Sequence, residues 1–128
     1  MHLIGLKKED VWIFSRWELT YPVGWDNITK AVASVYDYYD QVEVLADGEP
    51  VSVGSKDEIK DIPEDRTMTI RGISKIVKAP IMITFYNQLQ AVDVSVPLEI
   101  DEFRDTDYEK FNHSLCQYMD SIELAMHR

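Results

Sequence analysis

Alternating apolar and polar residues recur in short runs between residues 42 and 97, and this period of two is typical of β-strands. Residues 81–86 are rich in branched and aromatic side chains, and residues 89–97 alternate valine with polar side chains. Only a short polar stretch separates these two runs. Because parallel neighbours need a long crossover, the two runs predict an antiparallel pair. Residues 11–23 and 67–71 have similar patterns and predict further strands.

A tight turn and a polar connection interrupt the strand pattern. Asp47-Gly48 stands between the apolar runs 42–45 and 51–53. Both residue types tolerate positive φ, so we predict a β-hairpin there. The longest polar connection follows at residues 54–66. Within it, Ser55 and Glu58 have the spacing of a capping box, which predicts about one turn of helix.

Two segments have the three- and four-residue spacing of an amphipathic helix. The first covers residues 28–42, with Asp26 placed to cap its first turn. The second covers residues 108–126, behind a capping box formed by Thr106 and Glu109. Each segment carries one apolar stripe, which has to be buried against another element.

The order of these elements is strand, helix, five or six strands and a long helix. A chain of 128 residues with this order predicts a single α+β domain over residues 1–128. One curved antiparallel sheet of about six strands, packed against a helix in the N-terminal half and the long C-terminal helix, would bury both stripes. This order is similar to helix-grip folds of the START and Bet v1 type and to cystatin-like sheets. The resemblance implies a sheet that can enclose a pocket beside its helix.

Composition narrows the class of protein. The chain has 45% hydrophobic and 28% charged residues, which are ordinary values for a globular protein. The single cysteine, Cys116, cannot form an intramolecular disulfide. No apolar run reaches the roughly eighteen residues of a membrane span. The N-terminus lacks a secretory pattern, since Lys7 and Lys8 follow its first apolar residues. We therefore expect a soluble, cytoplasmic protein.

The formal net charge of −10 disfavours binding to nucleic acid or to an anionic membrane, because both present negative phosphates. One segment departs from this acidity, since residues 66–92 contain no acid. Its basic side chains are Arg66, Arg71, Lys75 and Lys78. They are typical of solvent-facing strand positions, and the alternative is a binding patch for an anion or a partner.

No spacing typical of a catalytic or metal site occurs in the sequence. His113 and Cys116 stand three apart on the last predicted helix, but structural zinc usually needs four converging ligands. The sequence therefore predicts no metal and no cofactor, and it favours a protein without catalytic activity. Asp93 lies inside an apolar strand, and alternation assigns it to the polar outer face. In a fold that encloses a cavity, Asp93 would be the acid to test.

Aromatic side chains concentrate in the first 25 residues and in the first predicted helix. Trp17 fits the apolar face of its strand, whereas Trp12 and Trp25 have no such assignment. The tyrosines near position 38 cannot all face one core. Since exposed aromatic residues anchor many interfaces, we predict that Trp12, Trp25 and Tyr38 contact a partner.

Two hypotheses about function follow. The first is a non-catalytic, acidic protein-interaction module: an inhibitor or immunity-type protein that covers a basic site, or a homodimer. Its charge would steer it toward basic partners. The alternative is a protein that binds a small hydrophobic ligand in a helix-grip or cystatin-like pocket. The candidate lining residues of that pocket are Met68, Met82, Phe85, Asp93, Tyr108 and Met119. The alternative interpretation is that the apolar residues among them fill the core and line no pocket.

Overall fold

Seven strands form one open antiparallel sheet in the computed structural model, which describes the backbone of residues 2–9, 12–75, 79–97 and 105–126 and most of their side chains. The strands are β1 (His2–Glu9), β2 (Trp12–Val23), β3 (Tyr39–Ala46), β4 (Glu49–Val51), β5 (Thr67–Ser74), β6 (Ala79–Tyr86) and β7 (Leu89–Pro97). The helices are α1 (Trp25–Val35) and α2 (Asp105–Met126), with short 3₁₀ helices η1 (Tyr36–Tyr38) and η2 (Lys56–Asp61). The predicted α+β class and antiparallel sheet are confirmed.

The strands lie in the order β1-β2-β7-β6-β5-β3-β4. β6 and β7 pair as predicted, with Ile83 opposite Val94. β3 and β4 form the predicted hairpin, and Asp47 and Gly48 in its turn have φ values of 48° and 82°. Positive φ at both central residues matches the right-handed twist of the flanking strands. This order places β5, β6 and β7 in the middle of the sheet.

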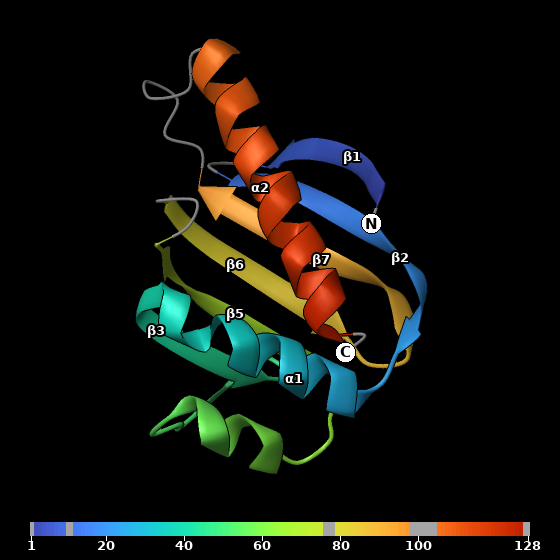
Figure 1. Cartoon of the computed structure of the whole chain (residues 1–128), viewed down its shortest axis with the longest axis vertical. Coiled ribbons are helices and arrows are strands. Elements are labelled where there is room, and N and C mark those ends of the chain that lie inside the picture. Colours follow the sequence, from blue (N-terminus) through green and yellow to red (C-terminus); the bar gives the residue numbers. More distant parts are fainter. Residues whose placement is uncertain (1, 10–11, 76–78, 98–104, 127–128) are drawn as a thin grey trace.

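Both helices pack on the same face of the sheet, as Figure 1 shows, and the core fills the space between the helices and the sheet. Strand alternation supplies one wall, in which Trp17, Val92, Phe85 and Met68 are successive cross-strand neighbours. Burial of one such side chain stabilises the fold by about 1.5–3 kcal/mol, so this wall determines which face points inward. The helices supply the other wall with Ile28, Ala31, Val32, Met119, Ile122 and Met126.

The first helix is shorter than the sequence predicts. Residues 36–38 form η1, and from Tyr39 the chain is strand β3, with Tyr39 opposite Ser74 and Asp40 opposite Ile73. The apolar spacing at 35–42 fits a helix, but its β-branched and aromatic residues also suit a strand. Pairing with β5 makes this segment a strand. The register of the pair shifts between Asp40 and Glu43, where Gln41 has a φ of 54°.

The helix caps and the N-terminal strand differ in part from the predictions. Gly24, not Asp26, is the N-cap of α1, and its carbonyl accepts the first helical bond from Ile28. The predicted capping box of Ser55 and Glu58 is present at η2. The predicted box of Thr106 and Glu109 lies outside the described side chains. Residues 2–9, for which the sequence analysis predicts no element, form β1 because β2 offers them a full antiparallel partner.

The helix η2 lies against α1 and extends the core beyond the sheet. Ile59 has no exposed surface, and the Trp25 indole N–H donates to the carbonyl of Ile62 at 3.0 Å. This contact fixes the segment that leads from η2 into β5. The same segment, at residues 64–66, lines a hollow at the end of the sheet.

Candidate functional site

The sheet face opposite the helices presents the alternate residues of the same strands. We call it the helix-free face, because both described helices lie on the other side. On β5 its residues are Thr67, Thr69, Arg71 and Ile73, and on β6 they are Pro80, Met82, Thr84 and Tyr86. The Thr69 and Thr84 hydroxyls lie opposite each other and share a hydrogen bond of 3.0 Å. The centre of this face is therefore polar and internally satisfied.

Asp93 holds a charged cluster together on this face. Arg16 donates from Nε to Asp93 Oδ1 at 2.7 Å and from Nη2 to Oδ2 at 3.0 Å. The Tyr86 hydroxyl donates to Oδ2 at 2.5 Å, and the Arg16 guanidinium lies 5.7 Å from the centre of the Tyr86 ring. Asp93 thus lies on the polar face, as its alternation predicts, but its side chain is only 6% exposed.

The protonation states in this cluster follow from burial and charge. Burial raises the pKa of the Tyr86 phenol, and the Asp93 carboxylate raises it further. The Arg16 pKa is also raised, first by its hydrogen bond to Asp93 and then by the charge of that carboxylate. Both groups therefore keep their protons at neutral pH and donate to Asp93. This arrangement is that of a structural ion pair, because both carboxylate oxygens are already engaged.

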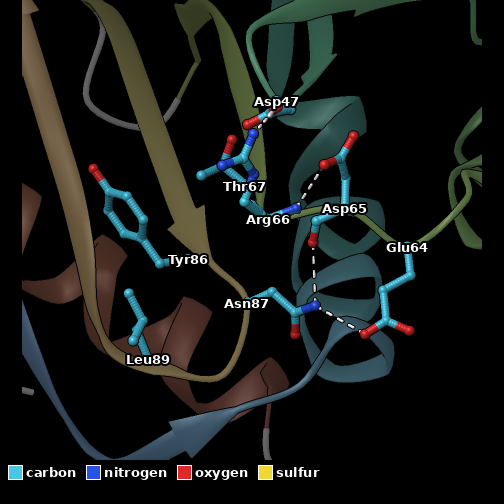
Figure 2. A pocket seen from close by; sticks show the side chains of 8 residues that line it. All are labelled: Asp47, Glu64, Asp65, Arg66, Thr67, Tyr86, Asn87 and Leu89. Carbon is cyan, nitrogen blue, oxygen red and sulfur yellow. Dashed lines mark hydrogen bonds and ion pairs between the residues drawn. The ribbon is translucent and has the colours of Figure 1, made fainter.

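A hollow of about 790 Å³ opens where β6 ends and β5 begins, as Figure 2 shows. We call it the acidic hollow, because three carboxylates and a single guanidinium line it. Tyr86 and Leu89 lie on one side of it, and Glu64, Asp65 and Asn87 lie on the other. Leu89 is 53% exposed, which is high for a large apolar side chain. The complete lining is Asp47, Glu64, Asp65, Arg66, Thr67, Tyr86, Asn87 and Leu89.

Asn87 ties the acidic side of this hollow together. Its Nδ2 donates to Glu64 Oε1 at 2.9 Å and to the Asp65 carbonyl at 3.1 Å. Both of these atoms can only accept, so they fix the orientation of the amide. The other atom of the amide, Oδ1, is buried and has no hydrogen-bond partner in the part of the chain that the structure describes. A buried acceptor without a donor costs free energy, and the two hydrogen bonds of the amide nitrogen offset part of that cost.

A second hollow, of about 380 Å³, lies toward the opposite ends of β5 and β6. We call it the apolar hollow, because Ile73, Pro80 and Met82 line it and its two charged groups, Arg71 and Glu43, pair with each other at 2.9 Å. Ile73 is 39% exposed. The complete lining is Gln41, Glu43, Arg71, Gly72, Ile73, Pro80, Ile81 and Met82.

The predicted basic patch is neutralised wherever the structure describes it. β5 lies beside β3, and the acids of β3 and its turn meet the bases of β5 and its flanks. The pairs are Arg66 with Asp47 at 3.2 Å, Arg71 with Glu43 at 2.9 Å and Lys75 with Asp40 at 3.6 Å. Lys78 lies outside the described residues. The three described bases are therefore spread along one strand, each beside an acid.

The three aromatic residues predicted to contact a partner have different outcomes. Trp25 is 8% exposed and belongs to the core, which corrects the expectation that it is exposed. Its place at the start of α1 turns the indole toward η2. Tyr38 is 49% exposed, at the end of η1. The side chain of Trp12 lies outside the described residues.

The six predicted pocket residues do not line one cavity. Met68, Phe85 and Met119 have no exposed surface and form part of the filled core. Met82 and Asp93 lie on the helix-free face, on the other side of the sheet. The side chain of Tyr108 lies outside the described residues. Strand alternation separates these side chains, because neighbours in sequence point to opposite faces.

Four residues that line the two hollows could not be recognised from the sequence as parts of a site: Asn87, Glu64, Ile73 and Pro80. Asn87 stands in a polar stretch between strands, which indicates a turn and nothing more. Its unpaired oxygen depends on how residues 64–66 approach it. Only Ile73 gives a signal in the sequence. Alternation assigns this isoleucine to the same face as Arg71, which indicates an apolar side chain on the polar face of the strand.

Two further observations concern metals and membranes. Among the described residues, no three His, Cys, Asp or Glu side chains lie close enough to hold a metal ion. Burial raises the pKa of the Cys116 thiol, and the charge of Asp120 raises it further. Within the same part of the chain, no helix has both the length and the apolar content that crossing a bilayer requires.

Comparison with known proteins adds no relative, since no family model, no curated protein and no solved structure matches this chain. The interpretation of the two hollows therefore depends on their chemistry.

Proposed function

We propose that this chain is a non-catalytic protein-interaction module that binds a basic protein partner through its helix-free face. The acidic hollow carries the proposal. It combines three carboxylates and one guanidinium with an apolar side formed by Tyr86 and Leu89. A lysine or arginine side chain is its chemical complement, because each has an apolar stem and a cationic end.

Charge complementarity favours this ligand class. Three carboxylates against one guanidinium leave two negative charges in the hollow, within a chain of net charge −10. Arg66 pairs with Asp47, and in the described part of the chain no cation pairs with Glu64 or Asp65. A field of this sign speeds the encounter with basic proteins and orients them as they bind.

Arginine fits the hollow better than lysine does. A guanidinium presents five N–H donors in one plane, so it can reach a carboxylate and a second acceptor together. Here the Glu64 and Asp65 carboxylates, which lie on the same side of the hollow, supply both acceptors. An inhibitor or immunity-type protein that covers a basic site is one form of this proposal. Self-association is the weaker form, because the described members of the predicted basic patch, Arg66, Arg71 and Lys75, lie beside acids of their own chain.

The test is an NMR titration of the whole chain with acetyl-arginine methylamide, observed at the side-chain amide of Asn87. The matched ligand is the citrulline analogue, which replaces the guanidinium by a neutral urea of similar shape. We expect shift changes at Asn87 with the arginine compound, weaker at high salt, and none with citrulline. Equal responses to both compounds would contradict the proposal.

A pair of variants locates the charge that matters. Glu64→Gln removes a charge but keeps an oxygen that can accept from Asn87, so the fold of the hollow is preserved. It should weaken binding of the arginine compound about threefold to tenfold, because a solvent-exposed ion pair contributes up to about 1 kcal/mol. Glu49→Gln, an exposed acid on β4 outside the hollow, is the control and should leave the affinity unchanged.

A further inference from the structure

The two hollows lie at opposite ends of one strand pair and on the same face. Thr67 and Tyr86, which line the acidic hollow, are directly paired across β5 and β6. Ile73 and Pro80, which line the apolar hollow, are paired in the same uninterrupted register. Six residues separate the two pairs along each strand. Because six is even, the side chains at both positions point to the same face.

We propose that the partner presents an extended segment along β5 and β6, with a cationic side chain in the acidic hollow and an aliphatic side chain six residues away in the apolar hollow. This inference rests on the proposed function, since the cationic anchor is the one argued above. At about 3.3 Å per residue the two anchors are roughly 20 Å apart in both the sheet and an extended segment. The even spacing turns both anchors of the segment toward the sheet.

The chemistry of the apolar hollow selects its ligand. Ile73, Pro80 and Met82 offer apolar surface, while Arg71 and Glu43 satisfy each other and offer no free charge. Two of the large apolar side chains that are exposed in the described structure, Ile73 and Leu89, lie in the two hollows. A leucine or isoleucine from the partner would remove Ile73 from water.

The surface between the hollows does not compete for the segment. Thr69 and Thr84 bond to each other, and Asp93 is bonded by Arg16 and Tyr86. With these polar groups satisfied, affinity is concentrated at the two ends. A ligand that joins both anchors gains affinity because the second contact forms within the complex.

The test uses an acetylated and amidated peptide of seven residues, with arginine first, leucine last and alternating threonine and serine between them. A second peptide moves leucine one place inward, which turns it to the opposite side of an extended chain. Shifts are followed at the Asn87 side-chain amide and at the methyl groups of Ile73 and Met82. We expect the first peptide to shift both hollows and to bind about tenfold more tightly than acetyl-arginine methylamide. The second peptide should shift the acidic hollow alone.

The variant Ile73→Thr separates this inference from the proposed function. It keeps a β-branched residue in the strand but removes apolar surface, so the tenfold gain should disappear while acetyl-arginine methylamide binds as before. The control is Leu124→Gln, which changes an exposed leucine on α2 outside both hollows and should leave the gain intact. If both peptides bind no better than acetyl-arginine methylamide, the extended segment is wrong and the acidic hollow stands. If nothing shifts at Asn87, both proposals fail.

Discussion

Replacing Arg16 with methionine should destabilise the fold far more than replacing Arg71 with methionine, although the two arginines are about equally exposed. Their side chains are 49% and 46% exposed, and each donates two hydrogen bonds to one carboxylate. The carboxylates differ, because Asp93 is 6% exposed and Glu43 is 39% exposed. Loss of the arginine therefore leaves a buried charge in the first case and a hydrated one in the second.

The magnitude follows from this difference in burial. Removing one partner of a fully buried ion pair costs about 3–5 kcal/mol, because the remaining charge is left without compensation. Asp93 keeps its hydrogen bond from Tyr86, and shortening the half-exposed Arg16 lets some water approach. We therefore expect a cost of about 2–3 kcal/mol for Arg16→Met. Arg71→Met should cost about 0–1 kcal/mol, as exposed pairs do.

Urea unfolding at pH 7, followed by tryptophan fluorescence, measures both free energies of unfolding. Methionine retains an unbranched apolar stem at either site, so the loss of packing is matched. Adding Asp93→Asn to Arg16→Met should restore part of the stability, because asparagine has no charge to bury. Equal costs at the two arginines, or no recovery in the double variant, would refute the reasoning.

Three other predictions test single groups. The raised pKa of Tyr86 means that its hydroxyl stabilises the fold below the ordinary tyrosine pKa of about 10 and loses this contribution as the pH rises through the folded value. In urea unfolding, Tyr86→Phe should therefore cost about 1–2 kcal/mol at pH 7 and less above pH 10, and a constant cost would contradict this. Gly72→Ala should cost about 1–3 kcal/mol, since the new Cβ would lie 2.8 Å from the Asp40 carbonyl oxygen, whereas Gly48→Ala meets open space and should cost about 1 kcal/mol for its φ of 82°. The reverse order would count against this account of the two glycines. Alkylation of Cys116 by iodoacetamide at pH 8 should be slower in the folded chain than in urea, because its raised pKa lowers the thiolate fraction, and equal rates would show that the fold does not protect it.

Much of the fold could be predicted because it depends on local chemistry. The Asp47-Gly48 turn, the capping box at Ser55 and the alternation of β6 and β7 are each determined by residues a few positions apart. The end of α1 could not be predicted in this way. Residues 35–42 satisfy both a helical and a strand pattern, and only pairing with β5 decides between them.

The candidate site depended almost wholly on contacts between distant segments. The sequence could assign Asp93 to the polar face, but not the ion pair with Arg16, which lies 77 residues away in the chain. It could identify Arg66, Arg71 and Lys75 as basic, but not the acids of β3 and its turn that neutralise them.

By itself the sequence determined the class of fold, the turns and which face of each central strand is apolar, since these follow from backbone conformation and from a period of two. Only the tertiary structure decided which strands are neighbours, and therefore which charges meet and which polar atoms remain unpaired. The acidic hollow is the clearest case. Its lining comes from the Asp47 turn, the segment 64–67 and the turn after Tyr86. Asn87 Oδ1 is buried without a donor among the described residues only because the folded sheet brings those segments together. The physical reason is that a hydrogen bond or ion pair acts over a few ångströms, and the chain sets such distances only when the whole sheet has formed.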